Sequence, residues 1–172
     1  MDGKIKPPKY AYFAYKTERR ASFLELVSKT AVAAVVVIYS ASLLAISLGD
    51  ILTGIGFAVV SGLSLAILSL SRKLLNKKRP YEIYDVSDLA PKLEGRRGGL
   101  SFPSRHVFSA FLIGTMLAFA SPLFGLAVAL LGILIALCRV ILLIHFPRDV
   151  IAGALIGIAA GVIGALALEF LI

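Results

Sequence analysis

Five long apolar stretches constrain the fold of this chain more than any other feature. Each is about 20 residues long, and an α-helix of that length crosses a hydrocarbon core ~30 Å thick. Charged residues are almost absent from them. The stretches are residues 30–48, 51–70, 103–120, 123–144 and 150–172. They predict an all-α fold, an integral-membrane helical bundle of about five transmembrane helices.

The composition agrees with a membrane protein. Of 172 residues, 59% are hydrophobic and the mean hydropathy is +0.92, whereas a soluble domain is about 45–50% apolar. A net charge of +8 can indicate nucleic-acid binding, but here the charges are grouped beside apolar stretches and Trp is absent. That grouping favours anionic lipid headgroups and phosphates over nucleic acid as partners. The single cysteine, Cys138, excludes an intrachain disulfide and a multi-cysteine metal site.

The N-terminal part differs from the rest, so we divide the chain into a basic segment, residues 1–29, and a transmembrane domain, residues 30–172. Residues 10–27 mix aromatic and basic side chains, which is typical of a helix that lies on a membrane surface. We therefore expect an N-terminal interfacial helix there. A cleavable signal peptide is not expected, because the basic leader is long and no clear small-residue cleavage site follows.

Three glycines recur every fourth residue on one helical face of the last apolar stretch: Gly153, Gly157 and Gly161. Small residues at this spacing allow helices to pack closely in lipid. Because the spacing is common in membrane bundles, we favour packing within the chain over a dimer interface.

The distribution of cations predicts the orientation. If the five stretches span the membrane, all 18 Lys and Arg residues lie on one side, and the other side carries Asp50 and Glu169. The positive-inside rule then places the N-terminus, the long polar segment 71–102 and both histidines on the cytoplasmic side of the plasma membrane. A sixth span formed by the N-terminal helix is an alternative, but it would break this segregation.

Two polar motifs at the ends of apolar stretches contain the only two histidines of the chain. Histidine, a carboxylate and several arginines at one depth are typical of a site that handles phosphate by acid–base or nucleophilic chemistry. Ionisable groups at membrane boundaries are functional more often than structural. The motifs are Pro103-Ser104-Arg105-His106 and Arg139-x5-His145-x3-Asp149.

Helix N-termini should line this site. Pro103 and Pro147 suit the first turns of helices, and helix N-termini offer free N–H groups that favour anions. Ser104 and Arg105 are expected at one N-terminus and Asp149 in the first turn of the next helix. Guanidinium and ammonium groups can clamp a phosphoryl group. The candidates are Arg79, Arg139 and either Arg72 or Lys73.

Three blocks of sequence resemble the type 2 phosphatidic acid phosphatase family, which shares its catalytic core with the vanadium haloperoxidases. That family's pattern is Lys-x6-Arg-Pro, then Pro-Ser-Gly-His, then Ser-Arg-x5-His-x3-Asp. The resemblance covers roughly residues 51–172. In this chain the first block, residues 72–80, reads Arg72-Lys73-x5-Arg79-Pro80. The second block is the motif at residues 103–106. The third block, residues 138–149, begins with Cys138-Arg139.

The chain departs from the family pattern at three positions. Arg72 occupies the place of the Lys, with Lys73 one residue away, and residues seven apart share a helical face, so Arg72 is the better match. Arg105 replaces the Gly of the second block, and Cys138 replaces the Ser of the third. The family usually has six spans, one more than we count here.

The resemblance implies a mechanism. His145 would attack phosphorus and form a phosphohistidine, and Asp149 would hold its other ring nitrogen. His106 would protonate the leaving alkoxide and then activate water. Phosphate would be bound by Arg72 or Lys73, Arg79, Ser104, Arg105 and Arg139. Neither a metal nor another cofactor is expected, because the arginines supply the positive charge.

The sequence thus predicts a membrane lipid phosphatase acting on a phosphomonoester or pyrophosphate of the phosphatidylglycerophosphate, phosphatidic acid or polyprenyl phosphate type. Two alternatives stay open: a phosphotransferase that uses the same phosphohistidine, and a non-catalytic membrane scaffold. An inward-facing site favours a substrate of the cytoplasmic leaflet. The identity of the lipid, the choice between mono- and pyrophosphate, and the oligomeric state are not determined by the sequence.

Overall fold

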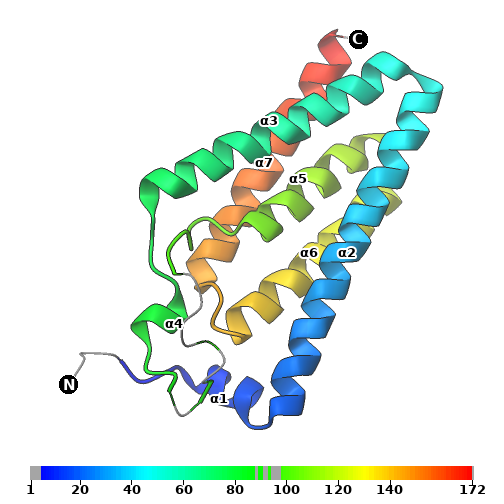
Figure 1. Cartoon of the computed structure of the whole chain (residues 1–172). Helices are drawn as coiled ribbons and strands as arrows, with labels where there is room; N and C mark the ends of the chain where they lie inside the picture. Colours follow the sequence, from blue (N-terminus) through cyan, green and yellow to red (C-terminus); the bar gives the residue numbers. More distant parts are fainter. Residues whose placement is uncertain (1–4, 88, 91–92, 94–97, 172) are drawn as a thin grey trace.

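The chain folds into a bundle of helices in the computed structural model, which describes residues 5–87, 89–90, 93 and 98–171 (Figure 1). The helices are α1 (Lys9–Tyr15), α2 (Glu18–Gly49), α3 (Ile51–Leu75), α4 (Pro80–Ile83), α5 (Arg105–Ala120), α6 (Pro122–Ile141) and α7 (Pro147–Leu171). Four candidate spans contain α2, α3, α6 and α7, and α5 is a shorter apolar helix. The predicted all-α membrane bundle is confirmed, with four helices long and apolar enough to span a membrane and α5 as a shorter apolar helix in the place of the fifth predicted span, and the protein is a multi-pass membrane protein.

The N-terminal helix is shorter than the sequence predicts. A single helix over residues 10–27 is wrong, because the chain breaks at Thr17, whose backbone is extended and whose side chain caps the next helix. Its Oγ1 accepts a hydrogen bond from the N–H of Arg20 at 3.3 Å, which satisfies a donor at the start of α2. α2 then runs for 32 residues without interruption. The boundary predicted between residues 29 and 30 therefore lies inside α2.

Helix α5 lies inside the bundle and packs against α6 and α7 (Figure 1). Glycine makes the contact with α7 possible: an added Cβ at Gly153 or Gly157 would lie 2.7 or 2.6 Å from a backbone oxygen of α5 or its N-cap. These distances are too short for a carbon atom, so a larger residue would push the two helices apart. The prediction that the glycine face packs within the chain is confirmed.

The two ends of the bundle differ. The N-terminus, α4 and the turn between α6 and α7 lie at one end, and the α2–α3 turn and the C-terminus lie at the other (Figure 1). At the first end a small apolar cluster includes Ala11, Tyr81, Val86 and Leu143. This cluster joins α1, α4 and the α6–α7 turn, so packing holds the segment after the first block against the turn of the third block.

Candidate active site

The third block forms a tight turn that returns the chain over the end of α6. Arg139 lies in the last turn of α6, and its carbonyl accepts hydrogen bonds from the N–H groups of Ile144 at 3.0 Å and His145 at 3.1 Å. Leu143 adopts a positive φ of 55° within the turn. α7 begins two residues after His145, at Pro147, as the sequence predicts. The turn therefore places His145 between Arg139 and the first residues of α7.

His145 and Asp149 form a buried pair. The Nδ1 of His145 lies 3.6 Å from Oδ2 of Asp149, and both side chains are 1% exposed. The same Oδ2 accepts a hydrogen bond from the N–H of Phe146 at 3.0 Å, while the N–H of Asp149 donates to the carbonyl of Phe146 at 2.9 Å. This reciprocal pair orients the carboxylate at the N-terminus of α7, where the helix favours negative charge.

Burial controls the protonation of His145. It is the main reason why the pKa of His145 lies below its ordinary value, because the charged form loses its hydration. The neighbouring Asp149 carboxylate raises this pKa, and the Arg79 guanidinium lowers it. His145 is therefore neutral at neutral pH, with one ring nitrogen carrying a free lone pair.

The second block sits directly against the third. The N–H of Ser104 donates to the backbone carbonyl of Asp149 at 2.9 Å, and Ser104 is fully buried at the N-cap of α5. Arg105 is exposed and His106 is half-buried, so the site is open on this side. His106 interacts electrostatically with Arg139, Arg105, His145 and Arg72. The two histidines predicted to work together thus lie in one cluster with the cations.

The first block contributes two arginines. Arg72 is 7% exposed and points inward from α3, where its Nη2 donates to the carbonyl of Leu100. Arg79 follows a left-handed Asn76 that ends α3, and its Nε donates to the carbonyl of Gly99 at 3.0 Å. Lys73, the alternative to Arg72, is exposed on another face of the helix. The structure therefore brings Arg72, and not Lys73, to the other candidate residues.

A further carboxylate fixes the first block in place. Oε2 of Glu82 accepts a hydrogen bond from the N–H of Arg79 and another from the N–H of Gly99, both at 2.7 Å. Arg79 also reaches the third block, because its Nη1 lies 3.4 Å from the carbonyl of Ile144. The segment at Gly99 and Leu100 is thus the point where both arginines of the first block are attached.

Ser101 is a site residue that sequence reasoning missed. It is 1% exposed, and its Oγ lies 2.5 Å from Oδ2 of Asp149 and 3.5 Å from Nδ1 of His145. The sequence offers only a serine near the end of a polar segment, outside the three blocks. Its proximity to His145 and Asp149 depends on packing between residues more than 40 positions apart.

Three buried polar atoms in the cluster of candidate residues lack a hydrogen-bond partner among the described residues. They are Oγ of Ser104, Nε of Arg139 and Oδ1 of Asp149. Buried groups of this kind are rare in folded proteins and call for an explanation such as a functional role. Oγ of Ser104 and Nε of Arg139 can donate to an anion, whereas Oδ1 of Asp149 can only accept a hydrogen bond. Within the described part of the chain, no group of three or more His, Cys, Asp or Glu side chains is placed to hold a metal ion.

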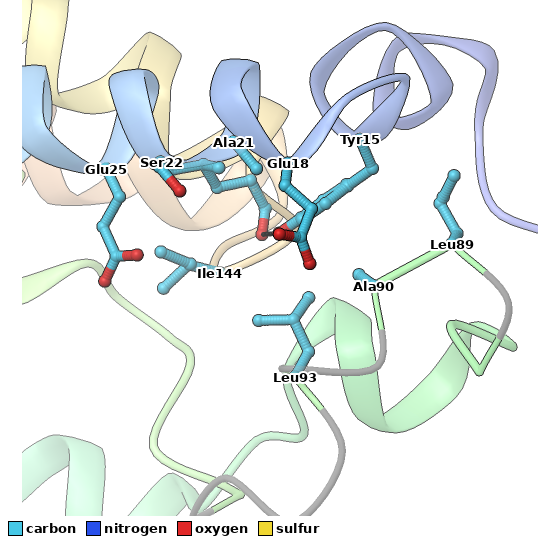
Figure 2. A pocket seen from close by; sticks show the side chains of 10 residues that line it. Tyr15, Glu18, Ala21, Ser22, Glu25, Leu89, Ala90, Leu93 and Ile144 are labelled. Carbon is cyan, nitrogen blue, oxygen red and sulfur yellow. Dashed lines mark hydrogen bonds between the residues drawn. The ribbon is translucent and has the colours of Figure 1, made fainter.

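Helices α1 and α2 support the turn that carries His145 from outside the three blocks. A cavity beside the turn is lined by Glu18, Ser22 and Glu25 of α2 and by Leu93 and Ile144 on the facing side (Figure 2). The hydroxyl of Tyr15 donates to the carbonyl of Leu142 at 3.0 Å, and Glu25 interacts electrostatically with Arg139. These contacts hold the turn that carries His145 against the N-terminal part of the chain.

Comparison with known proteins finds solved structures that share this fold. The fold is similar to the crystal structure of LpxE from Aquifex aeolicus, with a TM-score of 0.68, 22% sequence identity and coverage of 90% of this chain and 91% of that chain. It is also similar to the crystal structure of a transmembrane PAP2-type phosphatidylglycerolphosphate phosphatase from Bacillus subtilis. There the TM-score is 0.56, the identity 20% and the coverage 94% of this chain and 92% of that chain.

A search of curated protein sequences gives no significant match. The model of the PAP2 superfamily, however, matches residues 52–170, a range that contains all three blocks together with Ser101. The match spans more than half of the chain and agrees with the resemblance read from the motifs. The chain therefore belongs to the PAP2 superfamily.

Proposed function

We propose that this protein is a metal-independent membrane lipid phosphatase that acts through a phosphohistidine. The observation that carries the proposal is the buried His145–Asp149 pair inside a cluster of arginines. Membership of the PAP2 superfamily supports a hydrolase, and one structural neighbour is a phosphatidylglycerolphosphate phosphatase. The substrate is a lipid phosphomonoester or pyrophosphate whose tail lies in the bilayer.

The cations would bind the phosphoryl group. Arg72, Arg79 and Arg139 surround the histidines and interact electrostatically with them or with each other. Guanidinium groups bind phosphate oxygens with paired donors, and they stabilise negative charge that develops in the transition state. The buried Oγ of Ser104 and Nε of Arg139 would each gain a phosphate oxygen as partner. Arg105, at the open side, would contact the incoming substrate.

The reaction would occur in two displacements. A ring nitrogen of His145 attacks phosphorus, the N–P bond forms, and the P–O bond to the lipid breaks. The electron pair leaves with the lipid oxygen, which takes a proton from His106. His106 then accepts a proton from water as the water oxygen attacks phosphorus, the N–P bond breaks, and inorganic phosphate leaves. Asp149 stabilises the positive charge on the ring of His145 in both steps.

Phosphate release from a panel of lipids tests this function. The panel contains phosphatidic acid, phosphatidylglycerophosphate, a polyprenyl phosphate and a polyprenyl pyrophosphate, each with purified protein in detergent. We expect release from at least one lipid in the presence of EDTA, because the arginines carry the electrostatic role. Vanadate should inhibit, since it adopts the five-coordinate geometry of phosphoryl transfer. Activity that EDTA removes and a divalent ion restores would contradict the mechanism.

The same assay separates the alternatives. Adding a soluble alcohol should leave inorganic phosphate as the main product of a phosphatase. A phosphotransferase would instead produce the phosphorylated alcohol at the expense of free phosphate. No turnover with any lipid, from a protein that remains folded, would favour a non-catalytic scaffold.

We also propose that the active site faces the cytoplasm. The N-terminal segment, the start of α2, the end of α3, α4 and the α6–α7 turn lie at one end of the bundle, and most Lys and Arg residues belong to these parts of the sequence (Figure 1). The other end holds the α2–α3 turn, to which Asp50 belongs, and the C-terminal end of α7, to which Glu169 belongs. Short turns without cations, such as the one at Asp50, do not oppose this orientation. A cytoplasmic site favours lipids made in the inner leaflet, such as phosphatidylglycerophosphate or a polyprenyl-linked sugar phosphate.

Cysteine labelling of intact cells with an impermeant reagent tests the orientation in a Cys138→Ser background. Gly49→Cys should label from outside, because this position is exposed and an added Cβ meets nothing within 4 Å. Ser87→Cys, exposed in the segment that follows α4, should label only after the membrane is opened. The reverse pattern would overturn the orientation and make an outer-leaflet polyprenyl pyrophosphate the leading substrate.

A further inference from the structure

Backbone hydrogen bonds hold Ser101 in place, so its hydroxyl is available to interact with the candidate site residues. Its N–H donates to the carbonyl of Lys77 at 2.9 Å, which ties it to the first block. The carbonyl of the preceding residue, Leu100, accepts the guanidinium of Arg72. These two bonds fix the position of Ser101 without using its hydroxyl, which points to the third block instead.

The hydroxyl of Ser101 has a single hydrogen and two polar neighbours. An ionised Asp149 can only accept hydrogen bonds, so at 2.5 Å the hydroxyl donates to Oδ2 of Asp149. The lone pairs of Oγ are then the part of the group available to Nδ1 of His145, 3.5 Å away. Oδ2 of Asp149, 3.6 Å from Nδ1, is likewise only an acceptor. Both oxygens next to Nδ1 therefore favour a hydrogen on that nitrogen.

We infer that Ser101 is a positioning residue that, together with Asp149, holds His145 as the Nδ1–H tautomer and leaves Nε2 as the attacking atom. The inference rests on the proposed phosphohistidine mechanism and deepens it. When Nε2 forms the bond to phosphorus, the ring becomes positively charged, and Nδ1–H needs acceptors on the side facing Asp149. Distances of 3.5 and 3.6 Å are long in the free enzyme, and such contacts tighten as charge develops.

Ser101 also orients the carboxylate. Oδ2 of Asp149 already accepts a bond from the N–H of Phe146 at 3.0 Å, and Ser101 adds a second donor. The two donors come from different segments, one before α5 and one before α7. Asp149 is thereby held in one orientation relative to the ring of His145.

The first test is the activity of Ser101→Ala. A hydrogen bond to a charged group contributes about 1.5–3 kcal/mol, and kcat/KM should accordingly fall roughly 10- to 100-fold. Ser101→Cys keeps the bulk but offers only a weak donor, so it should show a loss of similar size. Ser47→Ala is the matched control, because the Ser47 hydroxyl donates to the carbonyl of Leu43 in its own helix, near the opposite end of the bundle from the site. Wild-type kcat/KM in both Ser101 variants would overturn the inference.

The second test is the pH dependence of kcat/KM. The acidic limb of the wild type should lie below the ordinary value for histidine, because burial lowers the pKa of His145 and the neutral ring is the nucleophile. Without the Ser101 hydroxyl, Nδ1–H loses one acceptor, and Asp149 loses a donor that orients it towards the charged ring. The pKa of His145 should fall further, and the acidic limb should move to lower pH. The substrate ionises in the same way in both assays, so it does not contribute to the difference between the two pH profiles.

The third test reads the tautomer directly and needs no turnover. The chain has two histidines, so ¹⁵N-histidine labelling with a His106→Asn background leaves the signal of His145 alone. We expect hydrogen on Nδ1 in the parent and a mixture of tautomers after Ser101→Ala. An unchanged tautomer, with a uniform loss of activity at every pH, would reduce Ser101 to a packing residue. Failure of the phosphohistidine mechanism itself would appear separately, as turnover by His145→Ala.

Discussion

His145→Ala should abolish turnover of every lipid phosphate that the wild type hydrolyses. The substitution removes the proposed nucleophile, and losses on the order of 10⁶-fold follow when a nucleophile is removed from an enzyme that forms a covalent intermediate. The arginine cluster remains, so substrate and vanadate should still bind. Steady-state phosphate release gives the first measurement, and vanadate binding to the inactive protein shows that the site is intact.

Trapping of the intermediate makes this prediction sharper. Wild-type protein quenched during turnover of a substrate labelled in its phosphate should carry a phosphoryl group with the lability of phosphohistidine, stable in base and lost in acid. His145→Ala should carry none. A variant that keeps more than about a tenth of the wild-type activity would remove His145 from the nucleophile role, whatever the state of the arginines.

His106→Ala should lower kcat/KM by about 10²- to 10⁴-fold, the usual contribution of general acid–base catalysis. His106 is half-buried and close enough to the cations and to His145 to interact electrostatically with them. Its proposed task in the first step is to protonate the leaving oxygen. A substrate with a good leaving group, such as a nitrophenyl phosphate, does not need that proton. The loss in kcat/KM should therefore shrink strongly on such a substrate.

The second step gives His106→Ala a distinct signature. Dephosphorylation needs His106 as a base for water, so the phosphohistidine should accumulate on the good substrate and produce a burst of leaving group before slow turnover. His145→Ala serves as the comparison, because it should show neither burst nor trapped phosphate. An equal loss on lipid and nitrophenyl substrates would assign His106 to binding instead of proton transfer.

Local features of the sequence predict most of the fold. Apolar runs long enough to cross a bilayer are a property of single segments, and the helices that contain them are present in the structure. The glycine face of α7 is also a local pattern, and it meets the backbone of α5 as expected. The break at Thr17 is the main exception. A mixed aromatic and basic composition suits one interfacial helix, but the side chain of Thr17 caps a new helix there.

The first block shows how helical geometry decides between neighbours in sequence. Residues seven apart share a helical face, which favours Arg72 over Lys73 for the clamp. In the structure the helix ends at Asn76, so the chain between Arg72 and Arg79 is not helical throughout. Arg72 nevertheless points inward because α3 packs that face against the bundle and Leu100 accepts its guanidinium. The prediction from periodicity and the outcome agree, although the reason is tertiary packing.

By itself, the sequence determined which segments enter the membrane, where helices begin at Pro147 and near Pro103, and which histidines, arginines and carboxylate stand at those ends. These properties depend on hydropathy, backbone stereochemistry and spacing within single segments. Only the tertiary structure decided that Ser101 reaches Asp149 and His145, and that Tyr15 and Glu25 support the turn from α1 and α2. Those contacts join residues more than 40 positions apart, and no local pattern encodes them, because they arise only when the helices pack against each other.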